Sequence, residues 1–233
     1  MILDVQHLTK AYHSKKLFTK ARHALDDITF SMNDHEVLGV IGHNGAGKTT
    51  LFKCIMGFIF PDKGEIRSLN KKQIGYLPES PHFHNELTAE EHLDYYARLF
   101  DIPWRARKER IQTLLKETGL DRVKKTRLST FSKGMLQRFG IAQSLLNQPK
   151  LLILDEPIIG LDPMGRDDVV SLIQSSYQSG ASVLLSSHQL HDLEELCDRI
   201  AVMKQGRLLS CSDAKNFVDT ASENFKEYFV YDE

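Results

Sequence analysis

The sequence feature that constrains the fold most is a glycine-rich run at positions 42–49, which reads Gly-His-Asn-Gly-Ala-Gly-Lys-Thr. It matches the phosphate-loop pattern G-x-x-x-x-G-K-[ST] at every fixed position. An apolar, strand-like segment precedes it at 37–41 and a helical pattern follows it, so an incidental glycine turn is the weaker interpretation. The glycines allow several backbone N–H groups to face phosphate oxygens. The run therefore predicts an α/β fold that binds a nucleotide.

We expect the loop and the start of the following helix to hold the phosphates together. Lys48 places a positive charge on the terminal phosphates, and the Thr49 hydroxyl is a candidate ligand of Mg²⁺. The helix adds the positive end of its dipole. The complete set of expected nucleotide-binding residues in this segment is Gly42, His43, Asn44, Gly45, Ala46, Gly47, Lys48, Thr49 and Thr50.

Composition excludes several classes of protein. The 233 residues are 41% hydrophobic and 26% charged, which is typical of a globular chain. The net charge of −1 provides no global field for nucleic acid, and we expect no nucleic-acid partner. Three cysteines without a CxxC spacing disfavour disulfides and zinc. The N-terminal residues lack a signal-peptide pattern, and no apolar run approaches the roughly 20 residues of a membrane span. We therefore expect an intracellular chain that reaches a membrane only through a partner.

The hydrophobic pattern predicts strands alternating with helices, and hence a mainly parallel sheet with an N-terminal antiparallel portion. Expected strands are 2–8, 28–32, 37–41, 64–68, 73–77, 151–154, 181–185, 199–203 and 207–210. Expected helices are 48–60, 89–100, 104–118, 134–147, 164–178 and 189–197. We expect one domain over 1–233, with a core at 1–80 and 149–213, an inserted helical subdomain at 81–148, and a C-terminal helix and tail at 214–233.

Two acids follow the apolar run at 151–154 directly. In open α/β sheets, ligands bind at the carboxyl ends of the strands. Asp155 is expected to hold Mg²⁺, and Glu156 to orient or deprotonate the attacking water. An isolated Asp-Glu pair would more simply be a polar turn, but the phosphate loop elsewhere in the chain favours catalysis.

Further motifs resemble those of ATP-binding cassette (ABC) ATPases, a family built on the P-loop NTPase core. These are the signature-like FSKGM at 131–135, the D-loop-like GLDP at 160–163, the H-loop-like SSH at 186–188 and the Q-loop-like IGYLPE at 74–79. Their order and spacing cover residues 1 to about 212. The chain is most similar to ATPase subunits of ABC-2-type exporters in the exact residues of three motifs, GYLPESP, SKGM and LDPMGR.

The resemblance implies a head-to-tail dimer that holds each ATP between the phosphate loop of one copy and the signature of the other. It implies that Tyr12 stacks on adenine, that Ser132 and Gly134 contact the γ-phosphate, and that Asp162 acts across the interface. His188 would be catalytic beside Glu156. It further implies ATP and Mg²⁺ as cofactors, a transmembrane permease subunit as partner, and a location at the cytoplasmic face of the membrane.

The sequence departs from the family pattern at a few positions. Glu79 stands where many members have glutamine, and we still expect it to bind Mg²⁺ or water through oxygen. Lys133 and Met135 replace a glycine and a glutamine in the signature. Ile158 and Ile159 replace a small polar pair beside the catalytic glutamate, and they leave open a slow ATPase.

Simpler interpretations remain for individual residues and for the whole chain. His13 or Phe18 could replace Tyr12 at adenine, and His188 alone would more often be structural. The charged stretch 105–110 is expected to be a solvated helix face rather than a lipid-binding patch. Two other function classes remain: a soluble ABC ATPase of translation or DNA repair, which usually has two cassettes or a long insertion, and a weakly hydrolysing regulatory subunit.

Overall fold

The computed structural model describes residues 1–12, 22–215 and 217. The chain forms two compact units. Unit 1 comprises Met1–Leu69 and the chain from Ser182 onward, and unit 2 comprises Asn70–Ala181.

Unit 1 contains a three-stranded antiparallel sheet in the order β2-β1-β4. Its strands are β1 (Leu3–Tyr12), β2 (Arg22–Met32) and β4 (Lys63–Ser68). The buried side chains of β1 and β2 are apolar apart from Asp4, as a sheet covered on one face requires. This sheet is the antiparallel portion expected from the sequence.

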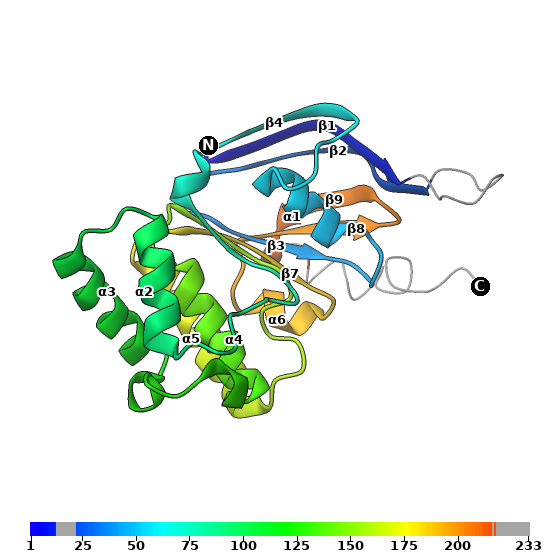
Figure 1. Ribbon diagram of the computed structural model, residues 1–233. Coiled ribbons are helices and arrows are strands. Elements are labelled where there is room, and N and C mark those ends of the chain that lie inside the picture. The colour runs from blue at the N-terminus through cyan, green and yellow to red at the C-terminus, as the bar shows by residue number, and fades with distance from the viewer. Residues whose placement is uncertain (13–21, 216, 218–233) are drawn as a thin grey trace, which may run out of the picture. The chain divides into compact units, whose positions relative to one another are not determined.

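A second group of strands in unit 1 carries the phosphate loop. Strand β3 (Val37–Ile41) pairs in parallel with both β7 (Ser182–Ser187) and β8 (Arg199–Lys204), and β8 forms a hairpin with β9 (Arg207–Asp213). All five residues of β3 are buried, as a central parallel strand demands. Helix α1 (Lys48–Met56) lies between these strands and the antiparallel sheet (Figure 1). A short helix, α6 (Leu190–Glu194), follows β7.

Unit 2 combines two parallel strands with four helices. The strands are β5 (Ile74–Leu77) and β6 (Leu151–Leu154). The helices are α2 (Ala89–Leu99), α3 (Trp104–Glu117), α4 (Lys133–Ser144) and α5 (Pro163–Gln178) (Figure 1). Helix α2 begins with a capping box between Thr88 and Glu91. A hydrophobic cluster from α2, α3 and α4 fills the centre of the helical part.

The expected fold class is therefore confirmed: an α/β chain, mainly parallel, with antiparallel strands at the N-terminus and a helical portion. No described helix is long and apolar enough to cross a membrane. The expected subdomain boundaries at 81–148 stay a prediction.

Some element boundaries were predicted wrongly. The expected helix 48–60 ends at Met56, because Gly57 adopts a left-handed conformation with φ 77° and its N–H bonds the carbonyls of Lys53 and Cys54. The expected helix 189–197 is only Leu190–Glu194. Most of the expected C-terminal helix and tail at 214–233 lies outside the described residues.

Candidate functional site

The phosphate loop of unit 1 forms the sharp turn that its glycines predict. Gly45 and Gly47 have φ values of 84° and 109°, in the region that only glycine adopts readily. A Cβ atom on Gly47 would meet the carbonyl oxygen of Ala24, and one on Gly42 would meet that of Met203. Both positions thus require glycine for space, and the loop lies against neighbouring backbone on its protein side.

Helix α1 begins directly after this turn. Its N-cap is Gly47, which offers no side chain to satisfy the first N–H groups of the helix. Lys48 is buried, and its ammonium donates hydrogen bonds to the carbonyl oxygens of Gly42 (2.5 Å) and His43 (3.4 Å). The loop therefore gathers a cation and helix N-terminal amides at one point, which is the chemistry that binds phosphate. Thr49 and Thr50 follow in the first turn of α1, both partly buried.

His188 emerges at the same edge of unit 1 as the phosphate loop. Strand β7 pairs with β3 so that Ser187 lies opposite Ile41, and the next residues of the two strands are His188 and Gly42. The Ser187 hydroxyl donates to Asp192 (3.0 Å) and accepts from the Gln189 N–H (3.0 Å), which fixes the turn around His188. The parallel register therefore brings His188 beside the phosphate loop.

Tyr12 lies at the end of β1, where it pairs with Arg22, and it is 46% exposed. An exposed aromatic ring is available for stacking, but adenine stacking stays a prediction. The alternatives His13 and Phe18 lie outside the described residues.

In unit 2, the two acids follow the buried strand β6 as expected. Asp155 is fully buried and Glu156 is 5% exposed. Glu156 has φ 51°, a left-handed conformation that a residue with a side chain rarely adopts and that clusters at functional sites. The Asp155 N–H donates to the Leu77 carbonyl at the end of β5 (2.9 Å), which fixes the two strand ends side by side.

Glu79 lies two residues beyond β5, at this same edge. The phenol of Tyr76 on β5 interacts electrostatically with both acids. Burial is the main cause that raises the pKa of this phenol, and the charges of Asp155 and Glu79 raise it further. The candidate magnesium ligands of unit 2, Glu79 and Asp155, are therefore brought into one region of negative potential. Carboxylate oxygens of this kind are what Mg²⁺ selects.

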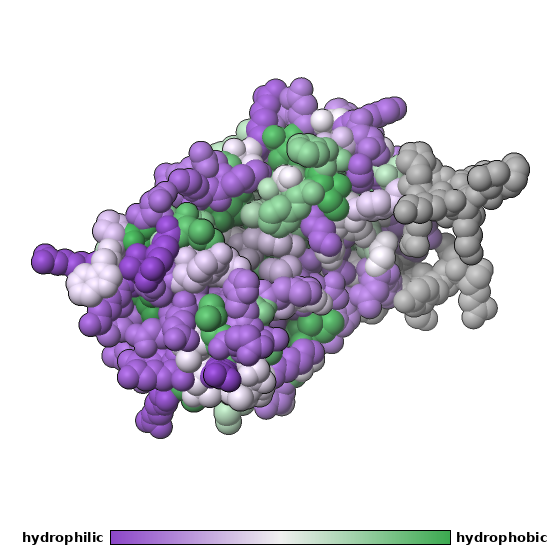
Figure 2. Space-filling view, in the orientation of Figure 1, coloured by the Kyte–Doolittle hydropathy of each residue, from purple (hydrophilic) through white to green (hydrophobic). Residues whose placement is uncertain are grey.

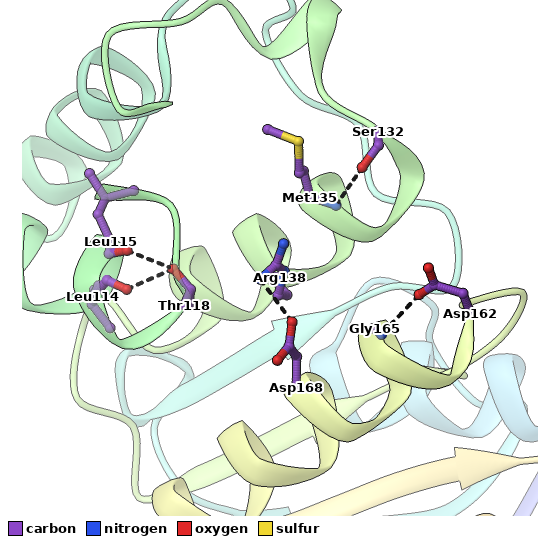
Figure 3. A network of polar contacts seen from close by, with 9 residues as sticks. All are labelled: Leu114, Leu115, Thr118, Ser132, Met135, Arg138, Asp162, Gly165 and Asp168. Atoms are coloured by element: carbon purple, nitrogen blue, oxygen red, sulfur yellow. Dashed lines mark hydrogen bonds and ion pairs between the residues drawn. The ribbon is translucent and has the colours of Figure 1, made fainter. Parts of the chain in front are cut away.

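The signature segment of unit 2 begins helix α4. Ser132 is exposed and is the N-cap of the helix, and its hydroxyl accepts a hydrogen bond from the Met135 N–H (3.2 Å; Figure 3). Gly134, in the first turn, faces Leu161 of the D-loop segment, since a Cβ there would lie 3.8 Å from a Leu161 methyl group. The side chain of Lys133 lies against Gly160.

Asp162 caps the next helix. It is exposed at the N-cap of α5, and its carboxylate accepts a hydrogen bond from the Gly165 N–H (2.9 Å; Figure 3). Helices α4 and α5 are joined by the ion pair of Arg138 and Asp168 (2.9 Å). Ser132, Gly134 and Asp162 thus belong to two neighbouring, exposed helix starts within unit 2.

Sequence reasoning missed one positioning residue, Gln137. It is 6% exposed on α4, and its amide donates to the Pro157 carbonyl (2.7 Å), immediately after Glu156. The bond ties the signature helix to the turn that carries the catalytic candidate. A polar residue among buried neighbours of a helix was the available signal, but its partner twenty positions away could not be read from the sequence. Ile158 is also buried, which accounts for an isoleucine in this turn.

The predicted site residues thus fall into two groups. The first group belongs to unit 1: Tyr12, Gly42, His43, Asn44, Gly45, Ala46, Gly47, Lys48, Thr49, Thr50 and His188. The second group belongs to unit 2: Glu79, Ser132, Gly134, Asp155, Glu156 and Asp162. Within each group, the strand ends and helix starts explain the arrangement. The roles given to these residues stay predictions.

Comparison with known proteins agrees with this chemistry. The family model described as ABC transporter matches residues 25–159. An uncharacterised ABC transporter ATP-binding protein of Synechocystis sp. is 39% identical over 91% of this chain and 62% of its own length. The bacitracin transport ATP-binding protein BcrA of Bacillus licheniformis is 36% identical over 89% of this chain and 68% of its own length.

The likeness extends to solved structures. The structure of an ATP-binding subunit of an ABC transporter superposes with a TM-score of 0.82 at 31% identity, covering 99% of this chain and 95% of that one. The chain spans about two thirds of the length of the relatives named above.

Proposed function

Because this chain belongs to the ABC transporter family of ATP-binding proteins, we propose that it binds and hydrolyses ATP to drive an ABC-2-type exporter. The observation that carries the proposal is the phosphate loop, whose positive-φ glycines leave no room for side chains and whose lysine is held at the loop. The relative named for bacitracin transport supports a role in transport.

The residues present fit ATP and Mg²⁺. The phosphate loop would hold the phosphates through its amides and Lys48, and Tyr12 would cover the adenine. Thr49, Glu79 and Asp155 supply the hydroxyl and carboxylate oxygens that Mg²⁺ prefers. When bound, the metal neutralises charge that develops on the phosphates.

Hydrolysis requires a base for water. Glu156 would accept a proton as the water oxygen bonds to the terminal phosphorus, while the bond from that phosphorus to the bridging oxygen breaks and leaves ADP and phosphate. Its position at 5% exposure places the carboxylate largely out of bulk water, where its interactions are stronger. His188, at the strand end beside the phosphate loop, would hold the terminal phosphate and the water.

The proposal includes a head-to-tail dimer. Ser132 begins a helix of 12 residues and is exposed, so its helix N-terminus is available to a phosphate held by a second copy. Asp162 begins the neighbouring helix and is exposed as well. We propose the second copy of this chain as one partner and a transmembrane permease as the other, at the cytoplasmic face of the membrane.

An exposed apolar segment in unit 1 supports a permease partner. Phe58 and Phe60, in the connection between α1 and β4, are 63% and 80% exposed. Figure 2 shows hydrophobic residues gathered on the visible face at the position of these two elements. Large apolar side chains exposed together are typical of a surface that a partner covers.

Two variants test the catalytic proposal. Lys48→Ala is expected to abolish ATP binding, because it removes the charge at the loop. Glu156→Gln is expected to keep ATP binding and to lower the turnover number by at least about 100-fold, the range of general base catalysis. Turnover by Glu156→Gln at the unaltered rate would overturn the assignment of the base.

The same assay decides the weakly hydrolysing alternative. The unaltered chain, assayed with and without the proposed permease partner, is expected to hydrolyse ATP well above the Glu156→Gln variant in both cases. Equal rates for the two proteins in both conditions would favour a regulatory ATP-binding module.

A further inference from the structure

Unit 2 contains a groove that no part of the proposed ATPase cycle uses. One cavity of about 340 Å³ is lined by Arg110, Lys150 and Ser175, among others. A second cavity of about 340 Å³ shares Glu117, Leu172 and Ser175 with the first. The two cavities therefore adjoin one another between α3 and α5, and together we call them the α3–α5 groove. Each volume lies in the range of small-molecule sites.

Arg110 differs from the other half-buried arginines of unit 2. Arg107 pairs with Asp94, and Arg138 pairs with Asp168. Arg110 has no carboxylate at ion-pair distance among the residues that the structure describes. Its one hydrogen bond runs from Nη2 to the Leu145 carbonyl (2.6 Å), and its Nε is buried without a partner. The guanidinium of Arg110 thus lines the groove without a carboxylate partner.

The stretch 105–110, which we expected to be a solvated helix face, is therefore only partly exposed to solvent. Arg105 is exposed, whereas Arg107 and Arg110 are half-buried. Burial lowers the pKa of Arg110, and the charge of Glu117 opposes that effect. The charge of Arg110 is thus partly desolvated and incompletely neutralised, which makes an anion the matching ligand.

The other residues that line this cavity also favour an anionic ligand. Lys150 also has no carboxylate at ion-pair distance within the described part of the chain, and Glu117 is the one acid that lines its cavity. Ser176 and Ser179 donate their hydroxyl protons to backbone carbonyls, but the hydroxyl of Ser175 makes no hydrogen bond to any described residue. The available donors are therefore the two cations, the Ser175 hydroxyl and the side-chain amide of Gln148.

We propose that the α3–α5 groove binds a small ligand through an oxyanion, a phosphate or a carboxylate, held by Arg110 and Lys150. The planar guanidinium matches the paired oxygens of either group. Lys150 adds a point charge, and Ser175 donates a further hydrogen bond. Arg110 then gains the anionic partner that no described carboxylate supplies.

The test is an NMR titration of the labelled full chain carrying Lys48→Ala, so that added phosphate is not taken up by the phosphate loop. Inorganic phosphate and malonate are the two probes, at an ionic strength held constant with chloride. The amides of 145–148, Lys150 and 175–181 and the Arg110 Nε–Hε signal are followed. Saturable shifts with one or both probes are expected, and the stronger probe identifies the oxyanion as phosphate or carboxylate.

Matched variants locate the binding. Arg110→Gln is expected to weaken it by about tenfold or more, as loss of a charge-assisted pair would. Lys150→Gln, which leaves the bond from Arg110 to Leu145 intact, is expected to weaken it by about threefold. Arg105→Gln makes the same charge change on an exposed position of α3 and is expected to leave the affinity unchanged.

Shifts that rise linearly with both probes, without saturation, would overturn the site. So would an equal loss of affinity in Arg105→Gln and Lys150→Gln, since this would reflect net charge alone. Neither result bears on ATP hydrolysis, because the groove shares no residue with the proposed catalytic set.

Discussion

Single backbone positions determine whether the phosphate loop can form. Gly47 has φ 109°, and a Cβ there would collide with the backbone oxygen of Ala24. Gly180 has a similar φ of 98°, but nothing lies within 4 Å of the place where its Cβ would be. Both positions favour glycine because of their positive φ, but only Gly47 also lacks the space for a Cβ atom. Comparing variants at the two positions therefore separates the effect of backbone conformation from the effect of space.

We predict that Gly47→Ala lowers ATP affinity by at least about 100-fold, roughly 2.7 kcal/mol, because the loop must shift away from Ala24 and the amides lose their alignment. Gly180→Ala is expected to cost about 1–2 kcal/mol of stability and to leave ATP affinity within about twofold. Calorimetric titration with ATP and urea unfolding measure both quantities. Equal affinities in the two variants would contradict the role given to the space around Gly47.

Candidate functional residues that belong to a short sequence motif could be predicted from the sequence. The phosphate loop, Asp155 and Glu156 each follow an apolar strand, and the structure places all of them at strand ends. Gln137 and Arg110 could not be found in this way. Their significance depends on a partner carbonyl or on a missing carboxylate, and both are facts of three-dimensional packing.

At the scale of elements, helix α4 joins the signature-like segment to the turn that carries Glu156, the proposed base. Its first residue follows the Ser132 cap, and one turn later Gln137 bonds the Pro157 carbonyl. Movement of this helix would therefore act directly on the backbone next to Glu156. The connection is short, buried and specific to one side chain.

We predict that Gln137→Leu leaves ATP affinity nearly unchanged and lowers the turnover number by roughly tenfold or more, because the turn that holds Glu156 loses its anchor. The buried Pro157 carbonyl is left without a donor, which should cost about 1–3 kcal/mol of stability. Steady-state kinetics and urea unfolding are the measurements. The control is Gln174→Leu, the same change at an exposed position of α5. A rise in KM with an unchanged turnover number would argue against positioning.

Helix α2 contributes a buried histidine to the helical core. His92 stacks on Tyr96 (4.8 Å between ring centroids), and its Nε2 bonds the Gln143 amide oxygen (2.8 Å). Burial is the main cause that lowers the pKa of His92, and neighbouring His84 lowers it further, while the bond to Gln143 opposes both. The folded unit therefore takes up the proton less readily than the unfolded chain does.

The sign of the pH effect follows from this difference. Above pH about 6.5 neither state is protonated and the stability is fully present; as the pH falls below 6.5, the unfolded state gains a proton first and the stability declines. Urea midpoints at pH 7.5 and 5.5 are expected to differ less in His92→Gln than in the unaltered chain. The exposed His82→Gln variant is expected to keep the full difference. An unchanged difference in His92→Gln would refute the assignment.

Element ends were harder to predict than elements. The pattern of α1 continues to Phe60 in sequence, yet the helix stops at Met56, because Gly57 takes φ 77° and closes the last carbonyls. Helix propensity and apolar pattern alone did not predict that the helix ends at this C-cap, because apolar residues continue beyond it. Those residues, Phe58 and Phe60, are exposed, so their hydrophobicity indicates a surface and not the core.

At the scale of the whole molecule, the proposed reaction needs residues from both units. The candidate phosphate-binding residues lie in unit 1, whereas the signature and the candidate carboxylates Glu79, Asp155 and Glu156 lie in unit 2. In the sequence, the whole of unit 2 is inserted between the two parts of unit 1. Sequence motifs identified each part, but the composite site across two copies follows only from the resemblance.

Hydrogen exchange distinguishes a nucleotide held by one copy from one held between two copies. We predict that MgADP and MgATP both protect amides 42–51 of the Glu156→Gln variant, because both nucleotides occupy the phosphate loop. Amides 132–136 should gain protection only with MgATP, because only its γ-phosphate reaches a second copy's helix start.

This second protection should vanish on dilution, since association of two copies follows mass action, whereas protection of 42–51 should remain as long as ATP exceeds its Kd. Ser132→Arg serves as the matched variant: it should abolish protection at the signature and leave protection at the phosphate loop. Protection of 132–136 that is independent of protein concentration would assign the signature to the ATP bound by its own chain, and the head-to-tail dimer would be wrong.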